Sequence, residues 1–239
     1  MFAGTVTQMW RWPVKGLRGE TVRTAVVGAE GMAGDRVLEV FRAGTDTGLW
    51  GGSHPRLMAW EAAWPAQCGC ADGTGDAPVV YEPGGAAWSA DEPGLAAALA
   101  ADLGEDGVEL RRRRREPGRV LVVFEASIRR LSEEMGREIE VERFRPNIMV
   151  AADAEPYAEA DFEPGLRVKL GASELTVQQP CERCVLPSWD PFGRERDKEL
   201  HRHLVTELGN RFGVYLEATE RAELRIGDEA SAALDGVRS

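Results

Sequence analysis

The sequence predicts a β-rich α+β protein whose short strands form a barrel or a curled sheet. Short runs of β-branched and aromatic residues recur along the chain, and glycines and prolines interrupt them. Only a few stretches have the 3.6-residue periodicity of an amphipathic helix. Strands do not alternate with helices, which disfavours a βαβ array with a parallel sheet.

The first half of the chain is expected to consist mostly of strands. Turns that contain Pro13, Gly16 and Gly19 separate the first of these strands. Runs of strand-forming residues predict strands at 5–10, 21–27 and 36–41, with another candidate at 57–63. The first helix is expected at 95–101, because Pro93 stands near its start and proline is favoured in the first turn of a helix.

The second half begins with an apolar strand at 120–124, and a helix is expected after it. Ser127 is the expected N-cap of this helix, and Gly136 is its expected end. A short amphipathic helix is expected at 199–208, and residues 231–239 are expected to be a frayed tail. Further strands are expected at 148–151, 167–170, 175–178, 213–218 and 223–226.

Five consecutive arginines, Arg111 to Arg115, divide the chain and are followed by Glu116-Pro117-Gly118. A solvated edge strand or linker is the favoured interpretation of this run; docking of a cofactor or partner is an alternative, as is bulk nucleic-acid binding. A length of 239 residues permits two domains. We therefore predict domains at residues 1–115 and 116–239 that share one cleft.

The charge balance limits the classes of partner. The 29 Lys and Arg residues face 40 Asp and Glu residues, a net charge of −11, which argues against broad nucleic-acid or anionic-membrane binding. An anionic ligand would have to be held by a few placed cations. The chain has no run of about 18 apolar residues and no signal-peptide pattern, so we expect no membrane span and a cytoplasmic location.

The most distinctive local motif is the C-x-x-C pair Cys181-Glu182-Arg183-Cys184. Arg183 would favour thiolate over thiol by Coulomb attraction. A single thiolate that binds a soft metal or carries sulfur is the favoured interpretation. A thioredoxin-like dithiol is disfavoured because the strand-like stretch 185–187 follows, and a zinc site would need Cys68 and Cys70 at an unusual spacing. Plain buried cysteines remain a further alternative.

Two other segments carry candidate anion-binding groups. In Arg143-Phe144-Arg145-Pro146-Asn147, two arginines lie on one face of a segment that is expected to be extended, which suggests that they bind a phosphate. The side-chain amide of Asn147 would then hydrogen-bond to a polar ring. The alternative, which the sequence favours equally, is that these residues are surface charges at a strand edge. Lys15 stands in a glycine-containing turn from which its ammonium could project over a site. Arg36 either pairs with Asp35 or a neighbouring acid, which is slightly favoured, or joins the anion site.

Other common site motifs are missing from the sequence. Neither a Walker loop nor a dinucleotide fingerprint occurs. His201 and His203 are two residues apart and so do not share a helix face, which disfavours a two-histidine metal site there. No local pattern indicates a Ser-His-Asp triad.

Taken in order, these motifs resemble the MOSC family, in particular the members related to the mitochondrial amidoxime-reducing component that carry an N-terminal β-barrel domain. The resemblance covers nearly the whole chain. It is carried by Pro13-Val14-Lys15, Gly34-Asp35-Arg36, His54-Pro55-Arg56-Leu57, Arg143 to Asn147, Cys181 to Cys184, Phe212 to Tyr215 and Ile226-Gly227-Asp228.

This resemblance implies a specific site and activity. A pterin-based molybdenum cofactor (molybdopterin) would lie between two domains, an N-terminal β-barrel-like domain and a MOSC β-barrel domain with a few short helices. Cys184 matches the cysteine that ligates molybdenum. The positions that hold the pterin and its phosphate match Lys15, Arg36, Arg145 and Asn147. The implied activity is a molybdenum-dependent reduction of N-hydroxylated or N-oxide-type small molecules.

The alternative function is that of a carrier, which would act through Cys181 and Cys184. It would carry either persulfide sulfur or the molybdenum cofactor. A protein that binds no cofactor is the alternative to cofactor binding. Two departures from the family pattern argue against an identical substrate range: Gly16 stands where serine is common, and residues 115–119 replace a loop that contains Asp and Pro. No Cys-rich ferredoxin-like segment is present, so electrons would come from a separate ferredoxin-, flavin- or cytochrome-type protein.

Overall fold

The computed structural model describes residues 2–65, 77–112 and 118–232. Several predictions made from the sequence lie outside these residues. They concern Cys68 and Cys70 as zinc ligands, the last three arginines of the run, the domain boundary at 115/116 and the tail from residue 233 onward.

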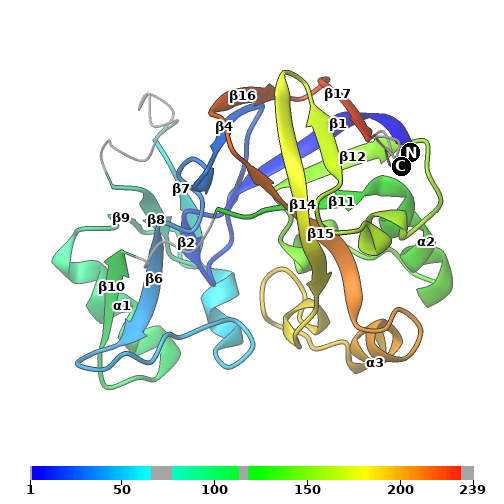
Figure 1. Ribbon diagram of the computed structural model, residues 1–239. Helices are drawn as coiled ribbons and strands as arrows, with labels where there is room; N and C mark the ends of the chain where they lie inside the picture. Colours follow the sequence, from blue (N-terminus) through cyan, green and yellow to red (C-terminus); the bar gives the residue numbers. More distant parts are fainter. Residues whose placement is uncertain (1, 66–76, 113–117, 233–239) are drawn as a thin grey trace.

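The larger part of the protein is a closed barrel of seven strands (Figure 1). Strands lie in the order β12-β11-β15-β14-β13-β17-β1, and β1 pairs with β12 to close the ring. Only the β11–β12 pair is parallel within it. The strands are β1 (Phe2–Arg11), β11 (Val120–Phe124), β12 (Ile148–Ala152), β13 (Arg167–Leu170), β14 (Ser173–Glu182), β15 (Arg211–Ala218) and β17 (Glu229–Ala232).

The barrel interior is apolar because side chains alternate along each strand, with period two. In β14 the residues at 173, 175, 177 and 181 are buried, while 174, 179 and 182 are exposed. Phe2, Val6, Val122 and Leu216 are among the side chains that fill the centre. The β-rich α+β class predicted from the sequence is confirmed.

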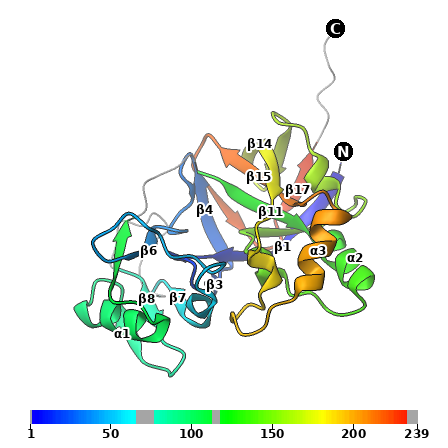
Figure 2. The same cartoon turned by 90° about the horizontal axis from the view of Figure 1, so that it is seen from below.

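A second lobe, blue to green in Figures 1 and 2, packs beside the barrel. Its core joins two small sheets to the helix α1 (Pro93–Leu103), with Trp60, Leu95 and Leu99 at its centre. The sheets are β10-β6-β2 and β7-β8-β9. Their strands are β2 (Val14–Lys15), β6 (Leu38–Arg42), β7 (Glu61–Ala63), β8 (Val79–Tyr81), β9 (Ala87–Ser89) and β10 (Val108–Arg112).

Shorter elements link the lobes and cover the barrel. The short strand β3 (Glu20–Thr21) pairs with the end of β1, and β4 (Thr24–Gly28) pairs with β5 (Gly31–Met32) and β16 (Ala222–Arg225). The remaining helices are η1 (Pro55–Ala59), α2 (Glu125–Met135), η2 (Val141–Phe144), η3 (Ala158–Asp161), η4 (Leu186–Ser188) and α3 (Lys198–Thr206).

The two-domain division stays a prediction, and the distribution of cores bears on it. Buried residues from Val14 to Val108 form the core of the second lobe. In contrast β1, at the start of the chain, is a barrel strand paired with β12 and β17. A domain defined by its own core would therefore leave residues 2–11 with the barrel.

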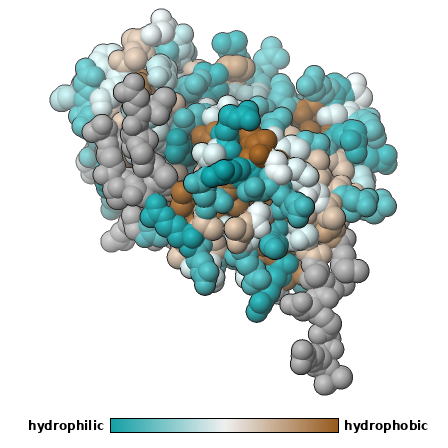
Figure 3. Space-filling model, turned by 90° about the horizontal axis from the view of Figure 1, so that it is seen from above, coloured by the Kyte–Doolittle hydropathy of each residue, from teal (hydrophilic) through white to brown (hydrophobic). Residues whose placement is uncertain are grey.

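The protein surface agrees with its charge composition. The face in Figure 3 is mainly hydrophilic, with small separate apolar areas. Within the described part of the chain, no helix is long and apolar enough to cross a bilayer.

Four local predictions about the second half are wrong, each for a physical reason. The helix α2 begins at Glu125 rather than after Ser127, and the Ser127 hydroxyl donates to Glu159 (2.8 Å) instead of capping. Residues 143–145 are not extended, since η2 ends there with Arg145 in a left-handed conformation. The stretch 185–187, expected to be strand-like, is not a strand, because residues 186 and 187 belong to η4, with Pro187 buried. Residues 231–232 belong to β17, which pairs with both β1 and β13.

The candidate strand at 57–63 is half right. Residues 55–59 form η1, because Pro55 begins it and proline suits the first helical turn, and only 61–63 are a strand. The expected end of α2 at Gly136 is confirmed: this residue has a φ of 65° and donates its N–H to the helix.

Candidate functional site

The structure brings Arg36, Arg145 and Asn147 together where the two lobes meet. Arg36 precedes β6 of the second lobe, while Arg145 and Asn147 lie between η2 and the barrel strand β12. The Arg36 guanidinium donates to the Arg145 carbonyl oxygen (3.0 Å) and to Asn147 Oδ1 (3.3 Å). It also pairs with Asp35, which confirms the interpretation that the sequence slightly favoured. A role of Arg36 in an anion site stays a prediction.

The backbone at this cluster is constrained. Arg36 and Arg145 have φ angles of 48° and 51°, in a region that side-chain-bearing residues seldom occupy. Among the described residues only Tyr157 and Asn210 also have positive φ without being glycine. Such conformations persist where the surrounding structure fixes them, and they are concentrated at functional sites.

Arg145 is a buried cation without a carboxylate partner in the described part of the chain. Its guanidinium donates to the Leu17 carbonyl oxygen and lies 4.2 Å from the centroid of the Trp12 ring. Burial, and then the charge of Arg36, lowers the pKa of Arg145 to about 9. An unpaired buried charge is costly, so this position favours the binding of an anion.

Asn147 is fully buried and its side-chain amide links three segments. Its Oδ1 accepts from the Leu121 N–H (3.1 Å) as well as from Arg36, and its Nδ2 donates to the Trp10 carbonyl oxygen (3.4 Å). These bonds hold β11, β1 and the segment before β12 in register at the site. Asn147 therefore holds the surrounding segments in place, in addition to any contact that its amide could make with a ligand.

Lys15 lies in β2, next to Gly16, whose φ of 97° forms the turn. The Lys15 side chain is 37% exposed, and its Nζ pairs with Glu39 Oε1 at 2.5 Å. Its ammonium is thus accessible to a ligand but is already neutralised by a carboxylate. A ligand at this place would compete with Glu39 for Lys15.

The two cysteines of the C-x-x-C motif have different environments. Cys181 is a buried residue of the barrel strand β14. Burial, and then contact with Cys181, raises the pKa of the neighbouring Tyr215 to about 12. Cys184 comes just after β14 and is exposed. Only the second thiol is therefore accessible to a ligand in solution.

Arg183 is a functional candidate whose role the sequence did not indicate. Its guanidinium turns away from solvent and donates to the carbonyl oxygens of Phe212 (2.8 Å) and Phe144 (3.0 Å). Its Nη2 is buried without a hydrogen-bond partner among the described residues. Gly213, with a φ of 78°, leaves room beside it. Its place next to the cysteines in the sequence suggested thiolate stabilisation. The sequence could not show that its guanidinium lies near the rings of Phe144 and Phe212, which stack on each other.

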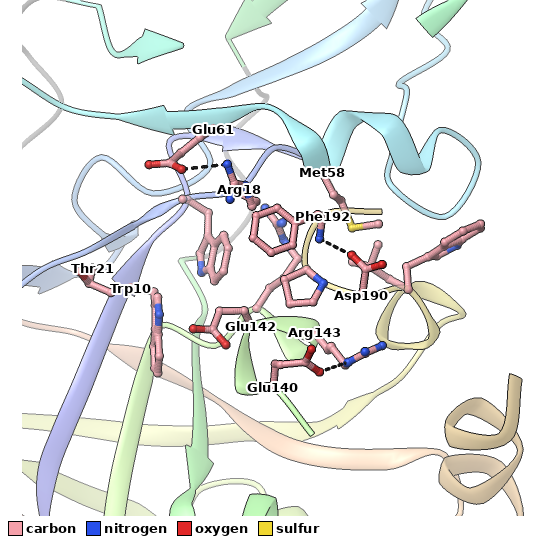
Figure 4. A pocket seen from close by; sticks show the side chains of 16 residues that line it. Trp10, Arg18, Thr21, Met58, Glu61, Glu140, Glu142, Arg143, Asp190 and Phe192 are labelled. Carbon is pink, nitrogen blue, oxygen red and sulfur yellow. Dashed lines mark hydrogen bonds and ion pairs between the residues drawn. The ribbon is translucent and has the colours of Figure 1, made fainter. Parts of the chain in front are cut away.

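A cavity of about 370 Å³ opens between η1 and β7 on one side and η2 and η4 on the other (Figure 4). Arg145 is one of the residues that line it, but Lys15, Arg36, Asn147 and Cys184 are not. The cavity therefore adjoins the arginine cluster at one residue only. No three His, Cys, Asp or Glu side chains gather as a metal-binding group within the described ranges.

A model of the MOSC domain family matches residues 112–231, half of the chain, and the protein belongs to the MOSC family. Molybdenum cofactor sulfurase of Anopheles gambiae is 35% identical over 100 residues, which are 40% of this chain and 12% of that protein. Mitochondrial amidoxime reducing component 2 of Homo sapiens is 26% identical over 122 residues, 46% of this chain and 35% of that protein. The chain thus matches about a third or less of the length of these relatives.

The fold has a solved counterpart. The crystal structure of the YUAD protein from Bacillus subtilis matches 96% of this chain and 94% of its own, with a TM-score of 0.50 and 13% sequence identity. At this identity the likeness concerns the fold alone.

Proposed function

We propose that this protein binds a molybdenum-containing pterin cofactor and reduces N-hydroxylated or N-oxide-type small molecules with it. The observation that carries the proposal is Arg145, a buried guanidinium with no carboxylate partner among the described residues, held beside Arg36. Names of two relatives, a molybdenum cofactor sulfurase and an amidoxime reducing component, support this choice of ligand and reaction.

The residues present fit such a group. Its phosphate would neutralise Arg145 and Arg36, and the unpartnered Nη2 of Arg183 is a further buried donor in the same part of the barrel. Lys15 would exchange part of its contact with Glu39 for the ligand. Cys184, the accessible thiol, would ligate the metal, as soft thiolate ligands do. When bound, the cofactor supplies two-electron redox chemistry at a metal.

The protein's own residues would orient the cofactor and set its electrostatic environment. Arg36, fixed by Asp35 and Asn147, cannot swing away from the site, so its charge is preorganised. Cys181, three residues before the exposed thiol, is buried and in contact with Tyr215 of the neighbouring strand β15. Electrons would come from a separate ferredoxin-, flavin- or cytochrome-type protein, for which complementary charge would provide docking. We expect this reaction to take place in the cytoplasm.

A carrier of sulfur or of cofactor is the second candidate. It is favoured by the exposure of Cys184 next to a buried cation, Arg183, and by the name of one relative, a sulfurase. As a sulfur carrier, the protein would hold a persulfide on Cys184 and would retain no metal. As a cofactor carrier, it would retain molybdenum but would not reduce N-hydroxylated substrates.

Elemental analysis of the protein purified from a cofactor-competent host separates the enzyme hypothesis from a sulfur carrier. The enzyme hypothesis predicts close to one molybdenum per chain, loss of the metal in Cys184→Ala, and retention in Cys181→Ala. Metal-free protein that carries labile sulfur on a cysteine would support the carrier instead. Stoichiometric zinc would contradict both.

A pair of arginine variants tests the placement of the clamp. Arg145→Ala should reduce molybdenum content and pterin fluorescence several-fold, because it removes the buried cation. Arg112→Ala, at an exposed position of β10, should leave both near the wild-type values. Equal losses in the two variants would contradict the assignment.

A further inference from the structure

A loop of the barrel reaches across to the second lobe at the edge of the cavity. Residues 189–196, which we call the strap, follow η4 and precede α3. Asp190, Pro191 and Phe192 of the strap line the cavity. Figure 4 shows Phe192 directed toward Arg18, which follows β2 of the second lobe. The strap is therefore a part of the cavity wall that connects the two lobes.

The strap keeps its own shape through internal hydrogen bonds. The Asp190 carboxylate accepts from the backbone N–H groups of residues 192, 194 and 195. The Asp190 N–H donates to the Glu195 carbonyl oxygen (2.9 Å), and Trp189 forms a β-bridge with Arg196 at the base of the loop. None of these bonds involves the second lobe, so all of them would persist if the strap left that lobe. The strap can therefore move as one unit.

Two kinds of contact join the strap to the second lobe. The Arg18 guanidinium lies 4.4 Å from the centroid of the Phe192 ring, and Glu61 fixes this arginine through an ion pair (3.0 Å). Phe192 is nevertheless 40% exposed, and a cation–π contact at an exposed site is weak. The second contact is the close approach of the Gly193 backbone to η1, where a Cβ on residue 193 would collide with the Pro55 carbonyl oxygen. Both contacts lie at the tip of the strap, so either can be removed without changing its base.

Met58 of η1 lies beneath the docked strap. It lines the cavity but is only 4% exposed, and its Cε lies 3.3 Å from where a Cβ on Gly193 would stand. The strap, by contrast, is exposed at residues 192 and 194–196. Segments with exposed surface and few buried apolar contacts are those that open locally. Opening of the strap would uncover Met58 and widen the route from solvent to Arg145, which lines the same cavity.

We propose that the strap is a lid on the cavity between the lobes, and that the contact of Phe192 with Arg18 is the latch that holds it closed. In the closed state the strap limits the access of solutes to the cavity and to Arg145. In the open state this link between the lobes is released, and a ligand can enter or leave. The lid is a property of the fold and does not depend on the redox function proposed above.

A thiol introduced by Met58→Cys in the full-length protein measures how often the lid opens. Its reaction with fluorescein maleimide, a reagent too bulky to pass the closed strap, follows the open population when opening is fast relative to labelling. Tandem mass spectrometry locates the label on individual residues, and the exposed thiol of Cys184 serves as the reference. With the strap intact, the introduced thiol should react at least about tenfold more slowly than Cys184.

Gly193→Ala in this background should open the lid by collision. It adds a methyl group at the cavity, yet it should speed labelling at least about fivefold, because the clash with Pro55 displaces the strap. Gly209→Ala is its control, since Gly209 also has a left-handed backbone, with a φ of 56°, but has open space around it.

Phe192→Leu should open the lid by releasing the latch. It keeps an apolar side chain but removes the ring, and should speed labelling about two- to fivefold through loss of the cation–π contact. Phe41→Leu is its control, because Arg111 lies at the same distance, 4.4 Å, from the Phe41 ring, and Phe41 does not line the cavity.

The outcomes are distinct. Faster labelling in Gly193→Ala and Phe192→Leu, with both controls equal to Met58→Cys alone, supports the lid. Labelling in Gly193→Ala that is slower than, or equal to, that in Gly209→Ala overturns it, because the added methyl group would then only fill space. Labelling of the introduced thiol as fast as Cys184 in the parent also overturns it, since the strap would then cover nothing. If urea unfolding shows that Gly193→Ala does not fold, the exposed change Phe192→Leu decides, and unchanged labelling there overturns the latch.

Discussion

The Arg36 guanidinium donates a 3.0 Å hydrogen bond to the backbone carbonyl oxygen of Arg145, 109 residues further along the chain. This bond joins the second lobe to the barrel and holds two like charges close together. The Arg36 charge contributes to the lowered pKa of Arg145, which means that the pair repels. Asp35, which pairs with Arg36, offsets part of this repulsion, and an anion bound beside the two guanidiniums would offset more of it.

Anion binding should therefore stabilise the protein. Phosphate at tens of millimolar should raise the free energy of unfolding by about 1 kcal/mol, as expected for a ligand present several-fold above its Kd. Arg145→Ala should remove this gain, and Arg112→Ala should keep it. Urea unfolding with and without phosphate, at ionic strength matched with chloride, measures both. An equal gain in the two variants would mean that phosphate acts elsewhere.

The two cysteines of the motif should differ in reactivity. Cys184 is exposed and Cys181 is 1% exposed, so iodoacetamide should modify Cys184 at least about tenfold faster under native conditions. Trypsin cleaves after Arg183 and separates the two thiols into different peptides, which mass spectrometry quantifies. In denaturant the two rates should converge. Similar native rates would show that β14 opens readily.

How much of the site is readable from the sequence depends on the kind of interaction. Residue order and the family resemblance single out Arg36, Arg145 and Asn147, and the structure brings these three into contact. The sequence could not reveal that Glu39 pairs with Lys15 or that Arg183 is buried, because both depend on contacts between distant segments. The burial of Cys181 could not be predicted from alternation, because Gln179, two residues earlier, is exposed and the register of β14 shifts at 177–179 and at 180–182. The strand also extends beyond the predicted 175–178.

The fold shows the same division. Strands with a strong apolar pattern were predicted closely, including 120–124 and 167–170. The errors concern short segments in which tertiary contacts override local preference. Ser127 has the residue type of an N-cap, but a buried carboxylate, Glu159, takes its hydroxyl. Residues 143–145 look extended, but η2 turns there so that Arg145 can reach Leu17.

Gly213 should be intolerant of a side chain. Its φ is 78°, and a Cβ there would lie 2.9 Å from both the Val122 carbonyl oxygen and Val123 Cγ2. Gly209 is its control, with a φ of 56° and open space around it. Gly209→Ala should cost about 1–2 kcal/mol for the left-handed backbone, and Gly213→Ala should cost at least about 2 kcal/mol more because of the clash. Urea denaturation compares the two, and equal losses would contradict the close packing beside Arg183.

Glu159 should make stability depend on pH. It is fully buried, and burial raises the pKa of its carboxyl from the ordinary 4.5 to about 6, against the hydrogen bonds from Ser127 and the Phe124 N–H. Between these values the folded protein holds a proton that the unfolded chain has released. The stabilising contribution is therefore complete below pH 4.5 and is lost as the pH rises through about 6.

Replacing this carboxyl with a neutral amide removes that dependence. Relative to wild type, Glu159→Gln should gain on the order of 2 kcal/mol in the free energy of unfolding between pH 4.5 and pH 7, at about 1.4 kcal/mol for each unit of pKa shift. Glu163→Gln makes the same change of charge at an exposed position and should leave the pH dependence unaltered. Urea unfolding across this pH range gives both slopes. If the Glu159→Gln slope equals that of wild type, the buried carboxyl does not take up the proton.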